Sequence, residues 1–251
     1  MKKYIALLLS ALMVLCLFAG CGTQESETSE PPAAESADPV ETAGAGETEG
    51  GYKFGLTTMG EASFWDAVEE GVLNVMNEGD ELIFVEGEHG NAAGQVDIIE
   101  DFIAQGCDLV FFNPVDADAA TSCLNLLEEA GIPVINFDSA CTDMSTVETF
   151  CATDNYAAGA LGAYSAITGA GADVDLYSVN GGPEAKAKML ADGEEGVWRA
   201  TSAQQPIKMG ETICELAYQY LAGEELESEY LIDAFIISPA NIEEYAGRDW
   251  Q

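Results

Sequence analysis

The sequence predicts an α/β protein built around parallel β-sheet, and two observations point to this fold class. From Tyr52 onward, short apolar runs alternate with segments of helical period, which is the order of strand–helix–strand units. Several of the apolar runs are continuous rather than alternating, as in strands that are covered on both faces. Helices are therefore expected on both sides of the sheet.

Five strands and a capped helix are expected in the first part of this region. The helix after the first strand should begin at Ser63, whose hydroxyl can cap the amide near Asp66. It places Phe64, Val68 and Val72 on one apolar face. The five strands cover residues 52–57, 81–86, 108–113, 132–137 and 147–152.

The next two helices end at glycines. One ends before Gly106, and the other is capped by Asp116 and ends before Gly131. Glycine is favoured after a helix because that residue takes a positive φ. The remaining elements are a helix over 155–168, a strand over 174–179, a helix after Pro183, a strand over 197–203, a helix over 209–221 and a strand over 231–237.

The first 20 residues have the pattern of an export signal. Lys2 and Lys3 precede an apolar run over residues 5–19, which is shorter than the roughly 20 residues that a membrane-spanning helix needs. Residues 1–20 are therefore interpreted as a signal peptide. The order from Leu17 to Cys21 resembles the lipobox of bacterial lipoproteins, which implies a lipid on Cys21. Simple secretion is the alternative.

A disordered linker is expected over residues 21–51. Residues 22–51 contain eight acidic side chains, no basic ones and no aromatic ones. Such a segment cannot bury enough apolar surface to fold. A flexible chain of this length has an end-to-end distance on the order of 30 Å, enough to hold a folded domain clear of a membrane.

Composition excludes several function classes. Residues 52–251 carry 37 acidic and 6 basic side chains, so nucleic acid is not an expected partner. This acidity favours solubility outside the cell, or attraction of a cationic ligand. His89 is the only histidine and lies in a polar turn, so no catalytic triad is expected.

No cofactor or metal site is expected either. The glycine-rich turn around His89 lacks the Lys and the Ser or Thr of a phosphate-binding loop. The cysteines form no C-x-x-C pair, so neither a zinc site nor a disulfide framework is expected. Cys141 and Cys151 could be bridged, or could be two buried thiols.

Several motifs near the strand ends carry a family resemblance. They are Ser63-Phe64-Trp65, the run over 113–119, Phe137-Asp138-Ser139 and Thr153-Asp154-Asn155, followed by segments at 179–183, 191–193, 203–210 and 241–245. In this order and spacing they resemble the type I periplasmic sugar-binding proteins of the ribose-binding kind. The resemblance covers nearly all of residues 52–246 and implies a two-lobe fold with Rossmann-like parallel sheets.

The resemblance also implies a division into lobes. Residues 52–154 and 206–240 would form the N-terminal α/β lobe, 155–205 the C-terminal lobe, and 241–251 a C-terminal segment. The family usually has several more strand–helix units between Asn155 and Asp173, where one helix is expected here. The C-terminal lobe is therefore predicted to be truncated by an internal deletion. A lobe this small is marginal alone, so weak or absent sugar affinity is expected.

The resemblance implies a ligand at the carboxyl ends of the strands, where open α/β sheets bind their ligands. Aromatic rings would stack on the sugar, Asp138 would accept two hydroxyl protons, and side-chain amides would line the cleft. The candidate ligand-binding residues are Glu61, Phe64, Trp65, Asn113, Asp138, Asn180 and Gln204.

These candidates have structural alternatives. Phe64 could be a core anchor of its helix, and Trp65 could cover the edge of the lobe. Asp138, Asn113 and Asn180 could be turn residues at strand ends. Ribose binders carry Arg where this chain has Ser139 and Asp where it has Asn180, so another sugar or a polyol is the expected ligand.

The expected function is that of an extracytoplasmic solute-binding lipoprotein of an ABC transporter. It would bind a monosaccharide or similar polyol and deliver it to a permease in the membrane to which its lipid anchors it. Two alternatives stay open: a ligand-sensing or surface interaction lipoprotein with the same fold, and an extracytoplasmic hydrolase that uses carboxylates such as Glu61 and Asp138.

Overall fold

The computed structural model describes residues 51–161 and 176–251. The signal peptide, Cys21 and nearly all of the linker lie outside the described residues. So does the second half of the helix expected over 155–168, whose first part is helical over 155–161. Within the described ranges, no helix has both the length and the apolar character needed to cross a bilayer.

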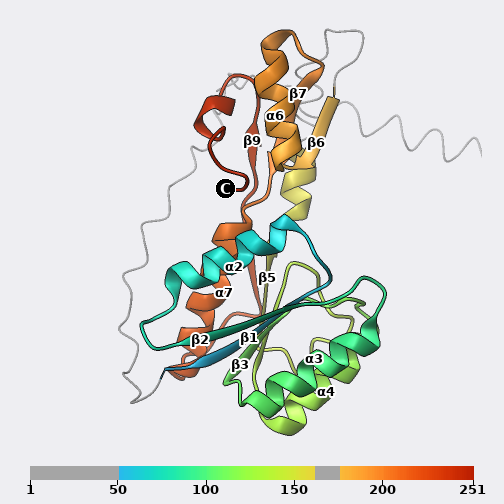
Figure 1. Ribbon diagram of the computed structural model, residues 1–251, viewed down its shortest axis with the longest axis vertical. Helices are drawn as coiled ribbons and strands as arrows, with labels where there is room; N and C mark the ends of the chain where they lie inside the picture. The colour runs from blue at the N-terminus through green and yellow to red at the C-terminus, as the bar shows by residue number, and fades with distance from the viewer. Residues whose placement is uncertain (1–50, 162–175) are drawn as a thin grey trace, which may run out of the picture. The chain divides into compact units, whose positions relative to one another are not determined.

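The larger of two sheets has six strands, each parallel to its neighbours (Figure 1). Their order is β2-β1-β3-β4-β5-β8. This confirms the predicted parallel sheet, and the five predicted strands all form within two residues of their expected bounds. The strands are β1 (Lys53–Thr58), β2 (Glu81–Glu86), β3 (Leu109–Phe112), β4 (Val134–Phe137), β5 (Thr149–Thr153) and β8 (Glu229–Ile232).

Helices cover both faces of this sheet, as the continuous apolar strands predicted (Figure 1). One apolar cluster lies between the sheet and α2 and α7, and a second lies between the sheet and α3 and α4. Every residue of the central strands β3 and β4 is buried. The helices are α2 (Ser63–Val75), α3 (Ala92–Gln105), α4 (Ala120–Ala130) and α7 (Pro206–Leu221).

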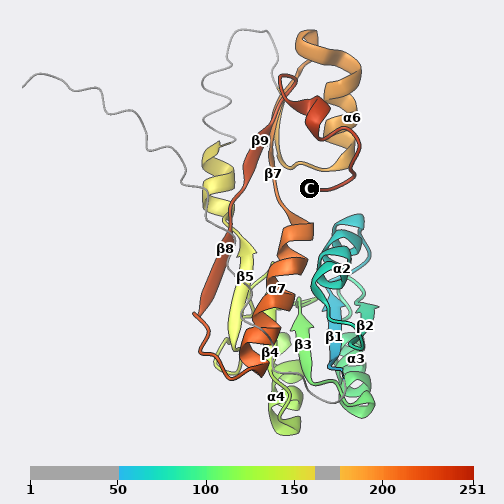
Figure 2. The same ribbon diagram turned by 90° about the vertical axis from the view of Figure 1, so that its left-hand side faces the viewer.

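The second sheet is smaller. Three described strands form it in the order β6-β7-β9 (Figure 1), with β6 parallel to β7 and β9 antiparallel to β7; β7 and β9 are also seen in Figure 2. The strands are β6 (Leu176–Asn180), β7 (Trp198–Ala203) and β9 (Phe235–Ile237), and they are accompanied by helix α6 (Pro183–Asp192) and two 3-10 turns, η1 (Gly193–Glu195) and η2 (Ile242–Glu244).

The predicted helix ends are confirmed at two glycines. Gly106 and Gly131 follow α3 and α4 in the left-handed conformation, with φ of 72° and 70°. The Asp116 carboxylate accepts hydrogen bonds from the backbone of Asp118 and Ala119, 3.0 and 2.8 Å away. It thus caps the turn that leads into α4.

Two expectations were wrong. The single strand expected over 231–237 is two strands, because the chain leaves the larger sheet after Ile232 and joins the smaller one at Phe235. The Ser63 hydroxyl does not cap α2. It instead accepts a hydrogen bond from the indole of Trp250, 3.2 Å away.

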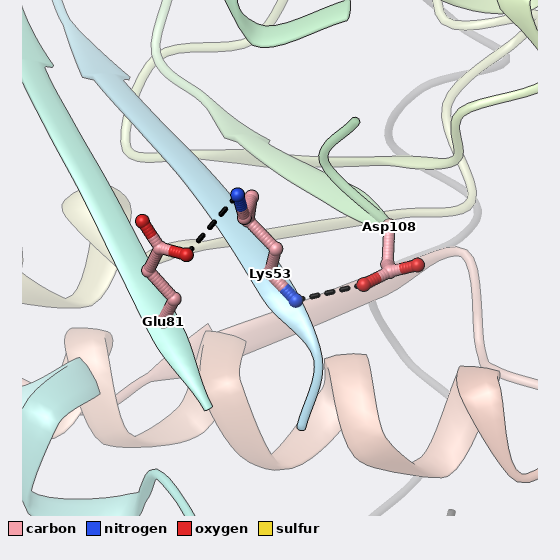
Figure 3. A network of polar contacts seen from close by, with 3 residues as sticks. All are labelled: Lys53, Glu81 and Asp108. Atoms are coloured by element: carbon pink, nitrogen blue, oxygen red, sulfur yellow. Dashed lines mark hydrogen bonds and ion pairs between the residues drawn. The ribbon is translucent and has the colours of Figure 1, made fainter. Parts of the chain in front are cut away.

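Polar contacts join strands β1, β2 and β3 at their amino ends (Figure 3). The Lys53 backbone donates to the Asp108 carboxylate at 2.7 Å, and the Lys53 ammonium lies 3.1 Å from the Glu81 carboxylate. The Glu81 side chain is 59% exposed, so this ion pair contributes at most about 1 kcal/mol. The backbone bond to Asp108 fixes the start of β3 beside β1.

Candidate functional site

The carboxyl ends of β1, β3 and β4 are held together by the buried side chain of Asn113. Its Oδ1 accepts from the Met59 backbone at 2.9 Å, and its Nδ2 donates to the Phe137 carbonyl at 3.1 Å. Asn113 is fully buried, as expected of a group that makes these bonds away from water. It therefore fixes the positions of the strand ends from which ligand contacts can be made.

Asp138 follows β4 in an unusual conformation. Its φ is 59°, in the left-handed region that few non-glycine residues adopt. The Ser139 hydroxyl donates to its Oδ2 at 3.0 Å. Burial raises the pKa of the Asp138 carboxyl, while hydrogen bonds from Ser139 and Asn113 lower it. Strained backbone of this kind is found most often at binding and active sites, which makes Asp138 a candidate for a ligand contact.

The two aromatic candidates are linked to Asp138 through the ring of Phe137. The rings of Phe64 and Trp65 meet edge to face at 4.8 Å, and Trp65 meets Phe137 at 6.1 Å. Phe137 is the residue before Asp138. Only 6% of Trp65 is exposed, so most of its surface belongs to the core, whereas Phe64 is half-buried. Phe64 is the ring with more surface available for a ligand.

Glu61 does not share contacts with Asp138, Phe64 and Trp65 in the described part of the chain. It is exposed, and its charge raises the pKa of the Glu86 carboxyl at the end of the edge strand β2, second to the effect of burial. No contact found in the described residues ties Glu61 to Asp138 or Phe64. Its role as a ligand residue stays a prediction.

The other two candidates form a second group, at the carboxyl ends of β6 and β7. Asn180 has a φ of 92°, and its carbonyl accepts from the Gln204 backbone at 3.1 Å. The Gln204 side chain donates to the Asn155 side chain at 3.1 Å. The sequence-predicted residues are thus brought together as two sets, one at the strand ends of each sheet.

A third set of residues, at positions 248–251, was not predicted from the sequence. The Trp250 ring meets Phe64 edge to face at 5.3 Å, and the Gln251 side chain donates to the Gln204 carbonyl at 2.7 Å. Residues 248–251 therefore contact both predicted sets. An aromatic residue in an otherwise polar tail was the one signal that could have identified this segment.

The described residues also form an open groove of about 580 Å³ between α2, α7 and the segment 247–250. None of the seven candidate ligand residues lines it. Its walls are polar and carry the carboxylates of Asp66, Glu70 and Glu211. The groove is therefore separate from the predicted ligand residues, whose role stays a prediction.

The described residues offer little other chemistry. Burial raises the pKa of all five cysteines within these ranges, to about 11 for Cys107 and Cys123 and to about 12 for Cys141, Cys151 and Cys214. Cys141 and Cys151 are both free thiols, not a disulfide. No group of three or more His, Cys, Asp or Glu side chains in this part of the chain could hold a metal ion.

Comparisons with known proteins identify the fold. The chain is 26% identical over 125 residues to the ribose import binding protein RbsB of Bacillus subtilis (strain 168), a match that covers 49% of this chain and 40% of that protein. A solute-binding protein of an ABC transporter from Mycobacterium smegmatis, with bound glycerol, is similar at a TM-score of 0.69 and 18% identity, covering 79% of this chain and 98% of the other.

A second solved structure has the same fold. The solute-binding protein of an ABC transporter from Bacillus halodurans C-125, with bound myo-inositol, has a TM-score of 0.60 and 18% identity over 82% of this chain and 99% of the other. A family model described as a periplasmic binding protein domain matches residues 53–188, more than half of the chain. The chain has the α/β fold of type I periplasmic binding proteins and belongs to the periplasmic binding protein domain family.

Proposed function

We propose that this protein is an extracytoplasmic solute-binding lipoprotein of an ABC transporter that binds a monosaccharide or similar polyol and delivers it to a membrane permease. Its relatives include a ribose import binding protein, and the similar solved structures hold small polyols such as glycerol and myo-inositol. The chain matches only 40% of that relative's length, so its ligand and its permease are themselves part of the proposal.

The observation that carries the proposal is the arrangement around Asp138. A partly buried carboxylate in a positive-φ conformation directly follows Phe137, whose ring lies 6.1 Å from that of Trp65, and Trp65 in turn meets Phe64 at 4.8 Å. A sugar presents hydroxyl donors on its edge and C–H groups on its faces. A carboxylate beside aromatic rings therefore matches both kinds of sugar surface.

Lipidation at Cys21 and the acidic linker complete the proposal. A lipid on Cys21 would hold the folded part near the membrane, and the linker would let it reach a permease. Metabolic labelling with a fatty acid tests this anchor. Label should enter the native chain in its host and be lost in Cys21→Ala.

A screen of thermal unfolding against D-ribose, D-fucose, D-arabinose, myo-inositol and glycerol tests the binding function. A ligand that binds only the native state raises Tm, and at 100 times its Kd it adds about 2.7 kcal/mol. At least one of these compounds should raise Tm in the native chain and fail to do so in Asp138→Ala.

Asp143→Ala is the matched control, because this carboxylate is exposed in the loop after β4 and should leave the response unchanged. We expect weak binding, because the described part of the second sheet has only three strands to close over a ligand. A Kd in the low micromolar range would contradict the expected weakness. The absence of any response across the panel would contradict the sugar-binding function itself.

A further inference from the structure

Lys186 is a buried cation whose hydrogen-bond acceptors come from the end of the chain. The residue is 3% exposed on helix α6. Its ammonium donates to the Arg248 carbonyl at 2.8 Å and to the Gln251 side chain at 3.1 Å. A buried ammonium without acceptors is costly, so these contacts tie α6 to residues 248–251. We call these four residues the C-terminal strap.

The strap also contacts α2, through Trp250. The indole nitrogen donates to the Ser63 hydroxyl at 3.2 Å, and the ring lies 5.3 Å from that of Phe64 with an angle of 86° between them. A Cβ added at Gly182 would lie 3.4 Å from the indole. The indole therefore lies close both to Phe64 and to the turn that starts α6.

We propose that the C-terminal strap is an autoinhibitory contact at the proposed sugar site, and that it has to move aside before a sugar can stack on Phe64. The inference rests on the proposed sugar site at Phe64 and Asp138. The Trp250 ring contacts the ring of Phe64, on which the sugar is proposed to stack, and the Gln251 side chain donates to the Gln204 carbonyl. The strap thus touches both predicted sets of ligand residues.

The strap should weaken the apparent affinity for the ligand. When the competent state is only a fraction of the population, the apparent Kd rises by the inverse of that fraction. A strap that is closed about 90% of the time would weaken binding about 10-fold. Loosening it should therefore tighten sugar binding, whereas removing an ordinary ligand-stacking residue should weaken it.

Acetylation of lysines in the full chain tests the strap without any sugar. Lys188 is the built-in control, because it lies on the same helix with a side chain that is 54% exposed. With N-hydroxysuccinimide acetate and readout by mass spectrometry, Lys186 should react at least about 10-fold more slowly than Lys188 in the native chain. Trp250→Ala should raise the rate at Lys186 several-fold and leave Lys188 unchanged.

If Trp250→Ala does not fold, as judged by the loss of cooperative unfolding, Ser63→Ala provides a milder variant. It removes the acceptor of the indole and leaves the strap sequence intact, so a smaller rise at Lys186 is expected. Equal reactivity of Lys186 and Lys188 in the native chain would overturn the proposal. So would a rate at Lys186 that neither substitution changes.

Calorimetric titration with D-fucose, D-arabinose and myo-inositol provides the second arm. Trp250→Ala or Ser63→Ala should bind with a Kd several-fold lower than the native chain. Weaker binding in Trp250→Ala would identify the indole as part of the binding surface and overturn the proposal. If neither the native protein nor either variant binds any of these sugars, while the substitutions still raise the acetylation rate of Lys186, the proposed sugar-binding function is wrong. The contact between the strap and α6 is then still supported.

Discussion

Asp138 combines the strongest chemistry of the predicted site with a backbone conformation that few residues tolerate. Its carboxyl is partly buried, and burial raises its pKa above the ordinary value, with hydrogen bonds from Ser139 and Asn113 acting against this. Two sugar hydroxyls can both donate to an ionised carboxylate, and such charge-assisted bonds are stronger than bonds to the protonated carboxyl, which has fewer acceptor sites. Protonation of Asp138 should therefore compete directly with ligand binding.

This competition gives a pH prediction. Because the pKa in the folded protein is raised, sugar affinity should fall as pH falls through that raised value, at a higher pH than the roughly 3.9 of an ordinary aspartate. The same shift means that the folded state prefers the protonated form, so Asp138 lowers stability as pH rises through that value. Calorimetric titration across pH 4 to 8 measures the first effect.

Asp138→Asn separates binding from stability. The amide keeps the shape, tolerates positive φ and needs no ionisation, so Tm at pH 7 should be equal to or above that of the native chain, while sugar binding is weakened because only one acceptor oxygen remains. A large drop in Tm would show that the charge stabilises the fold. A Kd that does not change with pH would remove Asp138 from the ligand contacts.

The positions of some site residues could be predicted from the sequence, because each of them directly follows one predicted strand. Asn113 and Asp138 come directly after apolar runs, so their position at the sheet edge was predictable. Lys186 and its partner Gln251 are 65 residues apart, and the indole of Trp250 meets Ser63 across 187. Such pairings depend on the path of the whole chain, which local spacing does not contain.

Among the elements, helices α2 and α7 pack at unusually short range. A Cβ added at Gly71 would lie 2.0 Å from the Ile207 carbonyl oxygen, and one added at Gly210 would lie 1.9 Å from that of Val68. Both atoms are backbone and cannot move without shifting a helix. The two glycines therefore set the distance between helices that cover one face of the larger sheet.

Gly71→Ala should accordingly destabilise the protein, although alanine is the better helix former by about 1 kcal/mol. Overpacking that displaces backbone costs roughly 1–3 kcal/mol, occasionally more, so a net loss of about 1–2 kcal/mol is expected in urea unfolding. Gly159→Ala is the matched control, since nothing lies within 4 Å of its added Cβ. Equal stability of the two variants would show that the helices can separate freely.

Periodicity predicted the type of nearly every element, but not where the chain changes sheet. The sequence over 231–237 predicts one apolar strand, and the structure has the strands β8 and β9 at its two ends. β8 pairs with β5 and β9 pairs with β7, so only the pairing partners differ. A strand that passes between two sheets has the same composition as a strand that stays in one.

At the scale of the whole molecule, the resemblance to the sugar-binding family predicted the fold, while the division into lobes at 52–154, 155–205 and 206–240 stays a prediction. The resemblance could do this because the order of several weak motifs carries information that no single motif has. It could not supply the strap, because the motifs ended at residue 245.

Charge is the property that most distinguishes the chain as a whole. The formal net charge is −37 at pH 7, and residues 52–251 contain only 6 basic side chains. Unpaired carboxylates repel one another in the compact state, and salt screens that repulsion with a Debye length of about 30 Å at 0.01 M and about 10 Å at 0.1 M. Stability should therefore depend on ionic strength.

Raising NaCl from 10 to 300 mM at pH 7 should increase Tm by several degrees in scanning calorimetry. At pH 4, where about half of ordinary carboxyls are protonated, the increase should be smaller, which serves as the control. An unchanged Tm would mean that the charges are too widely spaced to repel. The same titration separates the two readings of the acidity, because affinity for a neutral sugar should hardly change with salt, whereas affinity for a cationic ligand should fall steeply.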